Sequence, residues 1–228
     1  MRFLVLLLLF VLGASAPALS RSPAAATVDW TTTFARAPEG GVRMGNPAAK
    51  VKLVEYGSRS CPVCKRFADE AGELRTRYVA SGKVSYEFRD FLVHPQDLGG
   101  AVIGQCVSDR NFFAILDQMF ANQNDFNNRA STLKISRVDQ ISAMQPLAAA
   151  KAWSDDIGYT ALVRQAGMPE ARIKACFSNP QAIPSLARQL QAGVKAGVDG
   201  TPTFFINGRK ISGFVWSQIE PQLQAAGG

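Results

Sequence analysis

The residues with the clearest chemical potential are Cys61 and Cys64, which form a C-x-x-C pair in the segment Ser60-Cys61-Pro62-Val63-Cys64. The preceding residues, Val51 to Tyr56, are apolar enough for a buried strand, and the residues from Pro62 onward have helical apolar spacing for about five turns. A cysteine at this junction lies at a helix N-terminus, where unpaired backbone N–H groups and the helix dipole stabilise a thiolate. The pattern therefore indicates thiol–disulfide exchange, in which Cys61 attacks and Cys64 resolves the mixed disulfide.

Two other interpretations of the pair are half of a zinc site and a static disulfide. A structural zinc site needs two further soft ligands. The chain has one histidine, His94, and no second C-x-x-C motif, so we expect no metal site. Pro62 suits the first helical position, because the N–H that proline lacks would have no partner there.

The first residues of the chain have the features of a cleaved signal peptide. Arg2 precedes an apolar run over residues 3–12, and small residues follow, which predicts a signal peptide over residues 1–16. Residues 17–27 are rich in Ala, Ser and Pro, and we expect them to form a flexible N-terminal segment. The mature protein is therefore expected to be exported.

Composition narrows the possible functions further. The net charge is +7, but the basic residues are scattered along the chain, which argues against a nucleic-acid-binding surface. The four cysteines are an even number, and in an exported protein this favours disulfides over free thiols.

Hydrophobic periodicity predicts strands at both ends of the chain and helices between them. The expected strands are 28–34, 51–56, 84–91, 203–206 and 209–212. A long helix is expected over 62–80, and later helices over 101–107, 112–120, 135–144, 146–153, 157–167, 170–177, 183–196 and 217–225. Residues 122–129 are polar and are predicted to form a loop.

The Cys61-Pro62-Val63-Cys64 motif, the later Thr201-Pro202-Thr203 segment and the helical stretch between them resemble the DsbA-like thioredoxin-fold thiol:disulfide oxidoreductases. The similarity is greatest to the alphaproteobacterial branch and extends over about residues 30–224. It implies an α/β structure: a thioredoxin fold (28–97 and 182–226) with an inserted α-helical domain (98–181).

The resemblance also implies roles for residues outside the C-x-x-C motif. The Thr201–Pro202 bond is expected to be cis and to present the backbone of Thr201 to a substrate strand, with a trans proline in a turn as the alternative. Glu55 is expected to exchange a proton with Cys64, although a glutamate at a strand end can also face water. We expect His94 to be a structural or surface residue outside the site.

Val63 departs from the pattern of strongly oxidising members, which carry a histidine at this position. A valine side chain offers no donor and no charge to the Cys61 thiolate. Pro62 and Val63 are therefore expected to tune the site, and the oxidising strength implied by the family is not assured.

Cys106 and Cys176 fall in two separate predicted helices. They can be buried free thiols that act as small apolar residues, or a structural disulfide. The even cysteine count, the expected export and the resemblance all favour the disulfide.

The leading hypothesis is a periplasmic dithiol oxidase without a bound cofactor, which donates the Cys61–Cys64 disulfide to unfolded or partly folded exported proteins. Its implied partners are those substrates and a membrane redox protein that reoxidises the cysteines, and we expect a monomer. A reductase or isomerase of the same fold is the first alternative, although residues 17–50 are too few for the dimerisation module usual in isomerases. A chaperone-like binder of unfolded segments with a static disulfide is the second.

Overall fold

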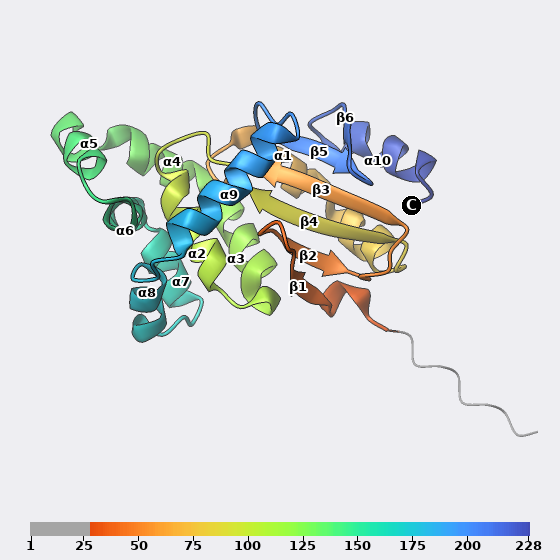
Figure 1. Cartoon of the computed structure of the whole chain (residues 1–228), viewed down its shortest axis with the longest axis horizontal. Helices are drawn as coiled ribbons and strands as arrows, with labels where there is room; N and C mark the ends of the chain where they lie inside the picture. Colours follow the sequence, from red (N-terminus) through yellow and green to blue (C-terminus); the bar gives the residue numbers. More distant parts are fainter. Residues whose placement is uncertain (1–27) are drawn as a thin grey trace, which may run out of the picture.

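A mixed sheet of six strands forms the centre of the computed structural model, which describes residues 28–228 (Figure 1). The strand order is β1-β2-β4-β3-β5-β6, and β3 is parallel to β4 whereas every other pair is antiparallel. The strands are β1 (Phe34–Arg36), β2 (Val42–Gly45), β3 (Val51–Gly57), β4 (Val84–Asp90), β5 (Thr203–Ile206) and β6 (Arg209–Ile211). The expected signal peptide and the segment 17–27 lie outside the described residues.

The unit β3–α1–β4 carries the C-x-x-C motif. The alternate residues Val51, Leu53 and Glu55 of β3 are buried, and helix α1 (Pro62–Glu70) begins directly after Cys61. Because β3 and β4 are central and parallel, the start of α1 lies at the carboxyl edge of the sheet. Figure 1 shows the two strands side by side.

The prediction of one helix over 62–80 is wrong. Helix α1 ends at Glu70, and the chain continues as a wider π-helix, η2 (Leu74–Val79). Gly72 lies at the break, and glycine is the weakest helix former after proline. The change of pitch lets Leu74, Tyr78 and Val79 all be buried against the sheet.

Seven helices separate β4 from α9 and β5, and they gather at one side of the sheet (Figure 1). They are α2 (Asp97–Cys106), α3 (Asp109–Ala121), α4 (Gln123–Thr132), α5 (Ile135–Ser142), α6 (Pro146–Ile157), α7 (Tyr159–Gln165) and α8 (Glu170–Cys176). Helix α9 (Ala182–Lys195) crosses the face of the sheet that carries Tyr56, and α10 (Trp216–Ala225) ends the chain. This arrangement, a mixed sheet with a helical insertion between β4 and α9, agrees with the predicted α/β fold class.

Three further local predictions need correction. Residues 122–129 are not a loop but most of α4, because Gln123 and Phe126 are buried on one helical face. Residues 28–34 are not a strand: a 3-10 helix, η1 (Trp30–Thr32), capped by Asp29, precedes β1. Strand β2 was not predicted, because its run between two turns is only four residues long.

A disulfide joins Cys106 at the end of α2 to Cys176 at the end of α8, with an S–S distance of 2.00 Å and a Cα–Cα distance of 5.4 Å. It links two points 70 residues apart within the helical region. None of the helices in residues 28–228 combines the length and apolar character needed to cross a membrane.

The buried side chain of Arg59 connects the sheet to the inserted helices. Its guanidinium forms an ion pair with Asp90 at the end of β4, and its Cζ lies 5.7 Å from the ring centroids of Phe88 and Phe112. Burial lowers the pKa of Arg59 to about 10, so it remains a cation at neutral pH. Two glycines of α2 make room for it: a Cβ on Gly100 would lie 2.7 Å from Arg59 Cδ, and one on Gly104 would overlap Arg59 Nη2.

This packing makes a prediction about Gly104. Gly104→Ala should destabilise the protein by about 1–3 kcal/mol, because the new methyl group displaces a guanidinium enclosed by an ion pair and two rings. Gly72→Ala is the matched control, since a Cβ there meets no atom within 4 Å; it should not destabilise the protein and can stabilise it by up to about 1 kcal/mol. Urea unfolding of both variants measures the difference, and equal midpoints would show that Arg59 does not depend on this space.

Candidate active site

The two cysteines of the motif lie in different environments at the start of α1. Cys61 is the N-cap residue and retains 7% exposure, whereas Cys64 lies in the first turn and is fully buried. Both are free thiols in this structure. The Cys61 thiol donates to the Thr201 carbonyl oxygen at 3.3 Å, and the Ser58 N–H donates to Cys64 Sγ at 3.5 Å.

These environments separate the acidities of the two thiols. The pKa of Cys61 is lowered to about 5, chiefly by the hydrogen bond from Cys64, against the opposing effect of partial burial. The Thr201 side chain and the backbone N–H groups of Cys64 and Val63 lower it further. The pKa of Cys64 is raised well above its ordinary value by burial, by its hydrogen bond to Cys61 and by the nearby Glu55 carboxylate. At neutral pH Cys61 is therefore a thiolate and Cys64 a thiol.

Val63 contributes to this thiolate through its backbone and not through its side chain. The side chain is 40% exposed, while its N–H stands at the helix N-terminus and lowers the pKa of Cys61. Pro62 occupies the first helical position, as its missing N–H allows. The stabilisation of the Cys61 thiolate thus comes from groups that are present whatever side chain occupies position 63.

The Thr201–Pro202 peptide bond is cis. Strand β5 begins at the next residue, and its Thr203 pairs with Tyr56 of β3, so the cis bond lies beside the residues that lead to Cys61. The Thr201 carbonyl oxygen lies 3.3 Å from Cys61 Sγ and accepts a hydrogen bond from it when Cys61 is protonated. Thr201 and Pro202 therefore flank the reactive sulfur on the β5 side.

Glu55 is buried in the core below the cysteines, with 1% exposure, and does not face water. The Tyr86 hydroxyl donates to Glu55 Oε2 at 2.5 Å. Burial raises the pKa of Glu55 to about 8, with the Tyr86 hydrogen bond lowering it and the Cys61 charge raising it. Glu55 is therefore largely protonated at neutral pH and can give a proton to a more basic group.

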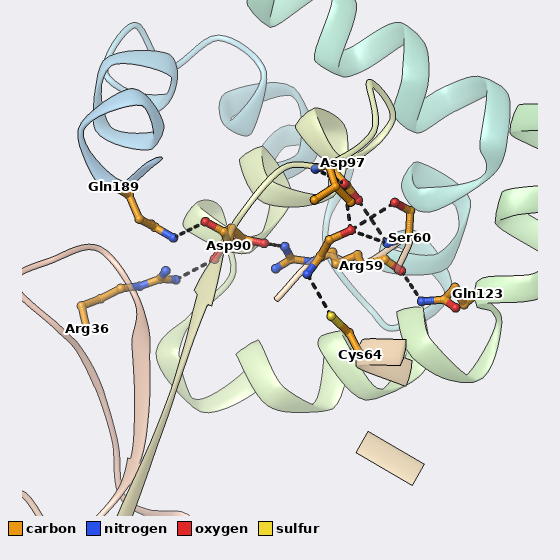
Figure 2. Close-up of polar contacts among 11 residues, drawn as sticks. Arg36, Arg59, Ser60, Cys64, Asp90, Asp97, Gln123 and Gln189 are labelled. Atoms are coloured by element: carbon orange, nitrogen blue, oxygen red, sulfur yellow. Dashed lines mark hydrogen bonds and ion pairs between the residues drawn. The ribbon is translucent and has the colours of Figure 1, made fainter. Parts of the chain in front are cut away.

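The turn between β3 and α1 is fixed by the carboxylate of Asp97, the first residue of α2 (Figure 2). Ser58 Oγ donates to Asp97 Oδ2 at 2.8 Å, and the Ser60 N–H donates to Oδ1 at 3.1 Å. The N–H groups of Val93 and His94 also donate to Oδ2, at 2.9 and 3.0 Å. One buried carboxylate thus ties the turn that ends in Cys61 to the loop after β4.

Helix α4 contributes two amide side chains to the same turn. Gln123 Nε2 donates to the carbonyl oxygens of Arg59 and Cys61, at 2.8 and 3.0 Å, and Asn127 Nδ2 donates to that of Ser60 at 2.9 Å. The sequence prediction missed both residues because it treated their segment as a polar loop. The available signal was the spacing of Gln123, Phe126 and Asn127, which puts them on neighbouring positions of one helical face.

His94 is exposed, as expected, but it also lies next to the active-site turn. Its Nδ1 forms a hydrogen bond of 2.8 Å with Ser60 Oγ, one residue before Cys61. Together with Ser60, Pro62 and Asn127 it lines a surface groove of about 410 Å³. No sequence spacing connects His94 to Ser60, because the contact follows from β4 lying beside β3.

The arrangement has the groups needed for thiol–disulfide exchange: a thiolate that retains slight exposure, a fully buried partner thiol and a buried acid. Within residues 28–228, no three His, Cys, Asp or Glu side chains are grouped as a metal site. Cys106 and Cys176 are joined to each other and are not part of the site. Fold and site together define a thioredoxin-fold protein with a dithiol centre.

Comparison with known proteins agrees with this class. A family model described as Thioredoxin matches residues 37–225, so the chain belongs to the thioredoxin family. The chain is 28% identical to a crystal structure of a protein-disulfide isomerase from Novosphingobium aromaticivorans, covering 80% of this chain and 95% of that one, with a TM-score of 0.75. Wolbachia pipientis alpha-DsbA1 shares the fold, with a TM-score of 0.61, 17% identity and coverage of 81% and 89%.

Curated relatives show the same resemblance. A protein of Rickettsia prowazekii, provisionally named a protein-disulfide oxidoreductase, is 26% identical over 188 residues, which are 80% of this chain and 60% of the relative. A similarly named protein of Rickettsia bellii is 25% identical over 192 residues, 82% of this chain and 65% of the relative. The chain thus spans less than two thirds of these relatives. The resemblance to DsbA-like proteins is confirmed.

The difference between the two thiols makes a direct prediction. Iodoacetamide should modify Cys61 at a rate that rises with pH around a midpoint of about 5 and is constant at neutral pH, because the thiolate is the form that reacts. Cys64 should remain unmodified until the protein is unfolded. Mass spectrometry of the reduced protein after timed alkylation measures both rates. A midpoint near 8.5, or equal rates at the two cysteines, would contradict the assignment.

Proposed function

We propose that the chain is a thiol:disulfide oxidoreductase that acts as a dithiol oxidase on exported proteins in the periplasm. The observation that best supports this is the asymmetry of the C-x-x-C pair. Cys61 has a lowered pKa and lies beside a cis proline, and Cys64 is a buried thiol above a buried acid. We assign Cys61 as the nucleophilic cysteine, Cys64 as the resolving cysteine, Thr201 and Pro202 as the substrate-facing backbone and Glu55 as the proton donor and acceptor.

The proposed reaction begins with the oxidised protein. A substrate thiolate attacks Cys61 Sγ, the Cys61–Cys64 bond breaks, and its electron pair passes to Cys64, which takes the proton of Glu55. A second substrate thiolate then attacks the substrate sulfur of the mixed disulfide and releases Cys61 as a thiolate. The substrate leaves as a disulfide, and its two electrons remain on the protein as the Cys61 thiolate and the Cys64 thiol.

The low pKa of Cys61 favours this direction of electron flow. A stable Cys61 thiolate stabilises the reduced protein, and a dithiol that is stable when reduced belongs to an oxidising disulfide. The steps require no bound cofactor. They do require another redox protein to remove the two electrons, and we propose a membrane protein for this role and a monomeric state for the chain. Periplasmic location would follow from the signal peptide expected at residues 1–16.

We also propose that the thioredoxin domain comprises residues 28–97 and 182–226, with residues 98–181 as the insertion. With these limits Asp97, whose carboxylate holds the turn before Cys61, is the last residue before the insertion. The sheet and α9 then belong to one domain, and the helices from α2 to α8 belong almost entirely to the other.

A reductase or isomerase is the second candidate. It is supported by the apolar Val63, which gives the Cys61 thiolate no side-chain donor, and by the similarity to the Novosphingobium aromaticivorans protein-disulfide isomerase. A chaperone-like binder with an inert disulfide would share the fold but not the chemistry.

The proposed activity can be tested by incubating the oxidised protein with a reduced, unfolded substrate that has several cysteines. An oxidase should form substrate disulfides in amounts that match the loss of its own. Cys64→Ser should accumulate mixed disulfides with the substrate, and Cys61→Ser should form none. Activity only on scrambled disulfides would favour an isomerase, and suppression of aggregation without thiol exchange would favour the binder.

Val63→His gives a quantitative test of how residue 63 tunes the site. A histidine there should add a stabilising charge or hydrogen bond to the thiolate, lowering the pKa of Cys61 and raising the reduction potential together. A tenfold change in the redox equilibrium corresponds to about 30 mV for this two-electron couple. Thiolate absorbance and glutathione titrations measure the two quantities.

Val194→His is the control for this variant, because Val194 is exposed on α9 and is not one of the groups that act on Cys61. If Val63→His behaves like this control, the side chain at position 63 does not tune the acidity of Cys61.

A further inference from the structure

Glu55 has one hydrogen-bonded oxygen and one free oxygen. Oε2 accepts from Tyr86, whereas Oε1 is buried without a hydrogen-bond partner. Oε1 lies against the backbone of Gly57, where an added Cβ would be only 2.8 Å from it. The next residue, Ser58, donates its N–H to Cys64 Sγ, so two consecutive residues of the chain lie next to the free oxygen and the buried thiol.

Tyr86 connects the other oxygen to a second group of polar residues. It lies on β4, with its ring centroid 5.5 Å from that of Phe113. Together with Arg75 and Asp117 it lines a small cavity of about 20 Å³, which has room for a single water molecule. The cavity lies between α1, η2, α3 and Tyr86 of β4.

Arg75 is held in a fixed position at this cavity. Its Nη1 and Nη2 donate to the two carboxylate oxygens of Asp117, at 2.5 and 2.7 Å. Its Cζ also lies 5.5 Å from the ring centroid of Phe113. A bidentate ion pair and an aromatic ring together fix the guanidinium more firmly than either contact alone.

The charged groups around Glu55 explain why the fixed position of Arg75 affects the ionisation of Glu55. The titratable groups that face it are Tyr86 from β4, Cys61 and Cys64 from α1 and Arg75 from η2, with Asp117 of α3 behind Arg75. Arg75 is the one cation among them, and the cysteines are neutral or negative. An ionised carboxylate in this core is therefore stabilised by the hydrogen bond from Tyr86 and, more weakly because Asp117 is paired with the guanidinium, by the charge of Arg75.

We propose that Tyr86 and Arg75, the latter held by Asp117, are positioning residues that allow Glu55 to ionise when it gives its proton to Cys64. The inference rests on the proposed function, because it concerns the same transfer. As the Cys61–Cys64 bond breaks, one proton passes from Glu55 to Cys64 Sγ through one water molecule, because no hydrogen bond joins the two side chains directly. This leaves a carboxylate whose Oε2 accepts from Tyr86. That carboxylate then recovers a proton from solvent before the next cycle.

The test uses the full-length protein and two variants, Tyr86→Phe and Arg75→Met. Each removes a group that stabilises ionised Glu55, so each should raise the pKa of Glu55, by about one unit for Tyr86→Phe. Since protonated Glu55 is the proton donor, disulfide donation should decline with rising pH above the pKa of Glu55. In the variants this decline should therefore move to higher pH. For Tyr86→Phe the shift should be about one pH unit, which is a tenfold lower proton concentration.

Two measurements follow the effect independently. Carbon-13 NMR of the Glu55 carboxyl gives its pKa in the reduced protein. The pH profile of disulfide donation to a model peptide gives the pH at which the rate of donation declines. Arg77→Met is the matched control, because Arg77 lies on the same π-helix but is exposed and pairs with Glu73 and Glu220. It should leave both quantities at wild-type values.

The outcomes are distinct. If Arg75→Met and Tyr86→Phe both match Arg77→Met, the positioning role is wrong. If only Tyr86→Phe fails to fold, Arg75→Met alone still decides the question. If the wild-type protein donates no disulfide at any pH, the proposed function fails, and the NMR titration still tests the link between Glu55, Tyr86 and Arg75.

Discussion

The site depends first on the four hydrogen bonds that converge on the carboxylate of Asp97. They hold Ser58 and Ser60 in the turn after β3 and the N–H groups of Val93 and His94 in the loop after β4. With this turn fixed, Cys61 becomes the N-cap of α1 and its sulfur lies beside free helical N–H groups. These donors satisfy both oxygens of a buried side chain and take the place of the water that would solvate an exposed turn.

Cys61 and Cys64 have pKa values shifted in opposite directions because they lie on different sides of the first turn of α1. The N-terminal end of the helix presents polar N–H groups, whereas the side that faces the core is packed against apolar residues. Cys61 lies on the open end, near the cis Thr201–Pro202 bond, and Cys64 points into the core above Glu55. The sheet order places the cis proline on the β5 side of this pair and the His94 loop on the β4 side. The strand order therefore places one of these segments on each side of the end of β3.

The inserted helices are structural parts of the site as well as an addition to the thioredoxin core. Gln123 and Asn127 of α4 bond the carbonyl groups of the turn, and the glycines of α2 leave space for the Arg59 guanidinium. Because these residues come from different helices, a displaced insertion would leave buried polar groups of the turn without partners. The disulfide between α2 and α8 joins two of these inserted helices to each other.

The sequence by itself determined the features that depend on local spacing. The C-x-x-C motif at a strand-to-helix junction, with Pro62 at the first helical position, indicated the chemistry, and periodicity located β3, β4, β5 and most helices. Tertiary structure alone decided the rest. It joined Tyr86 to Glu55 and His94 to Ser60. These contacts link residues 31 and 34 positions apart, and no periodic pattern encodes them, because they exist only once β4 lies beside β3.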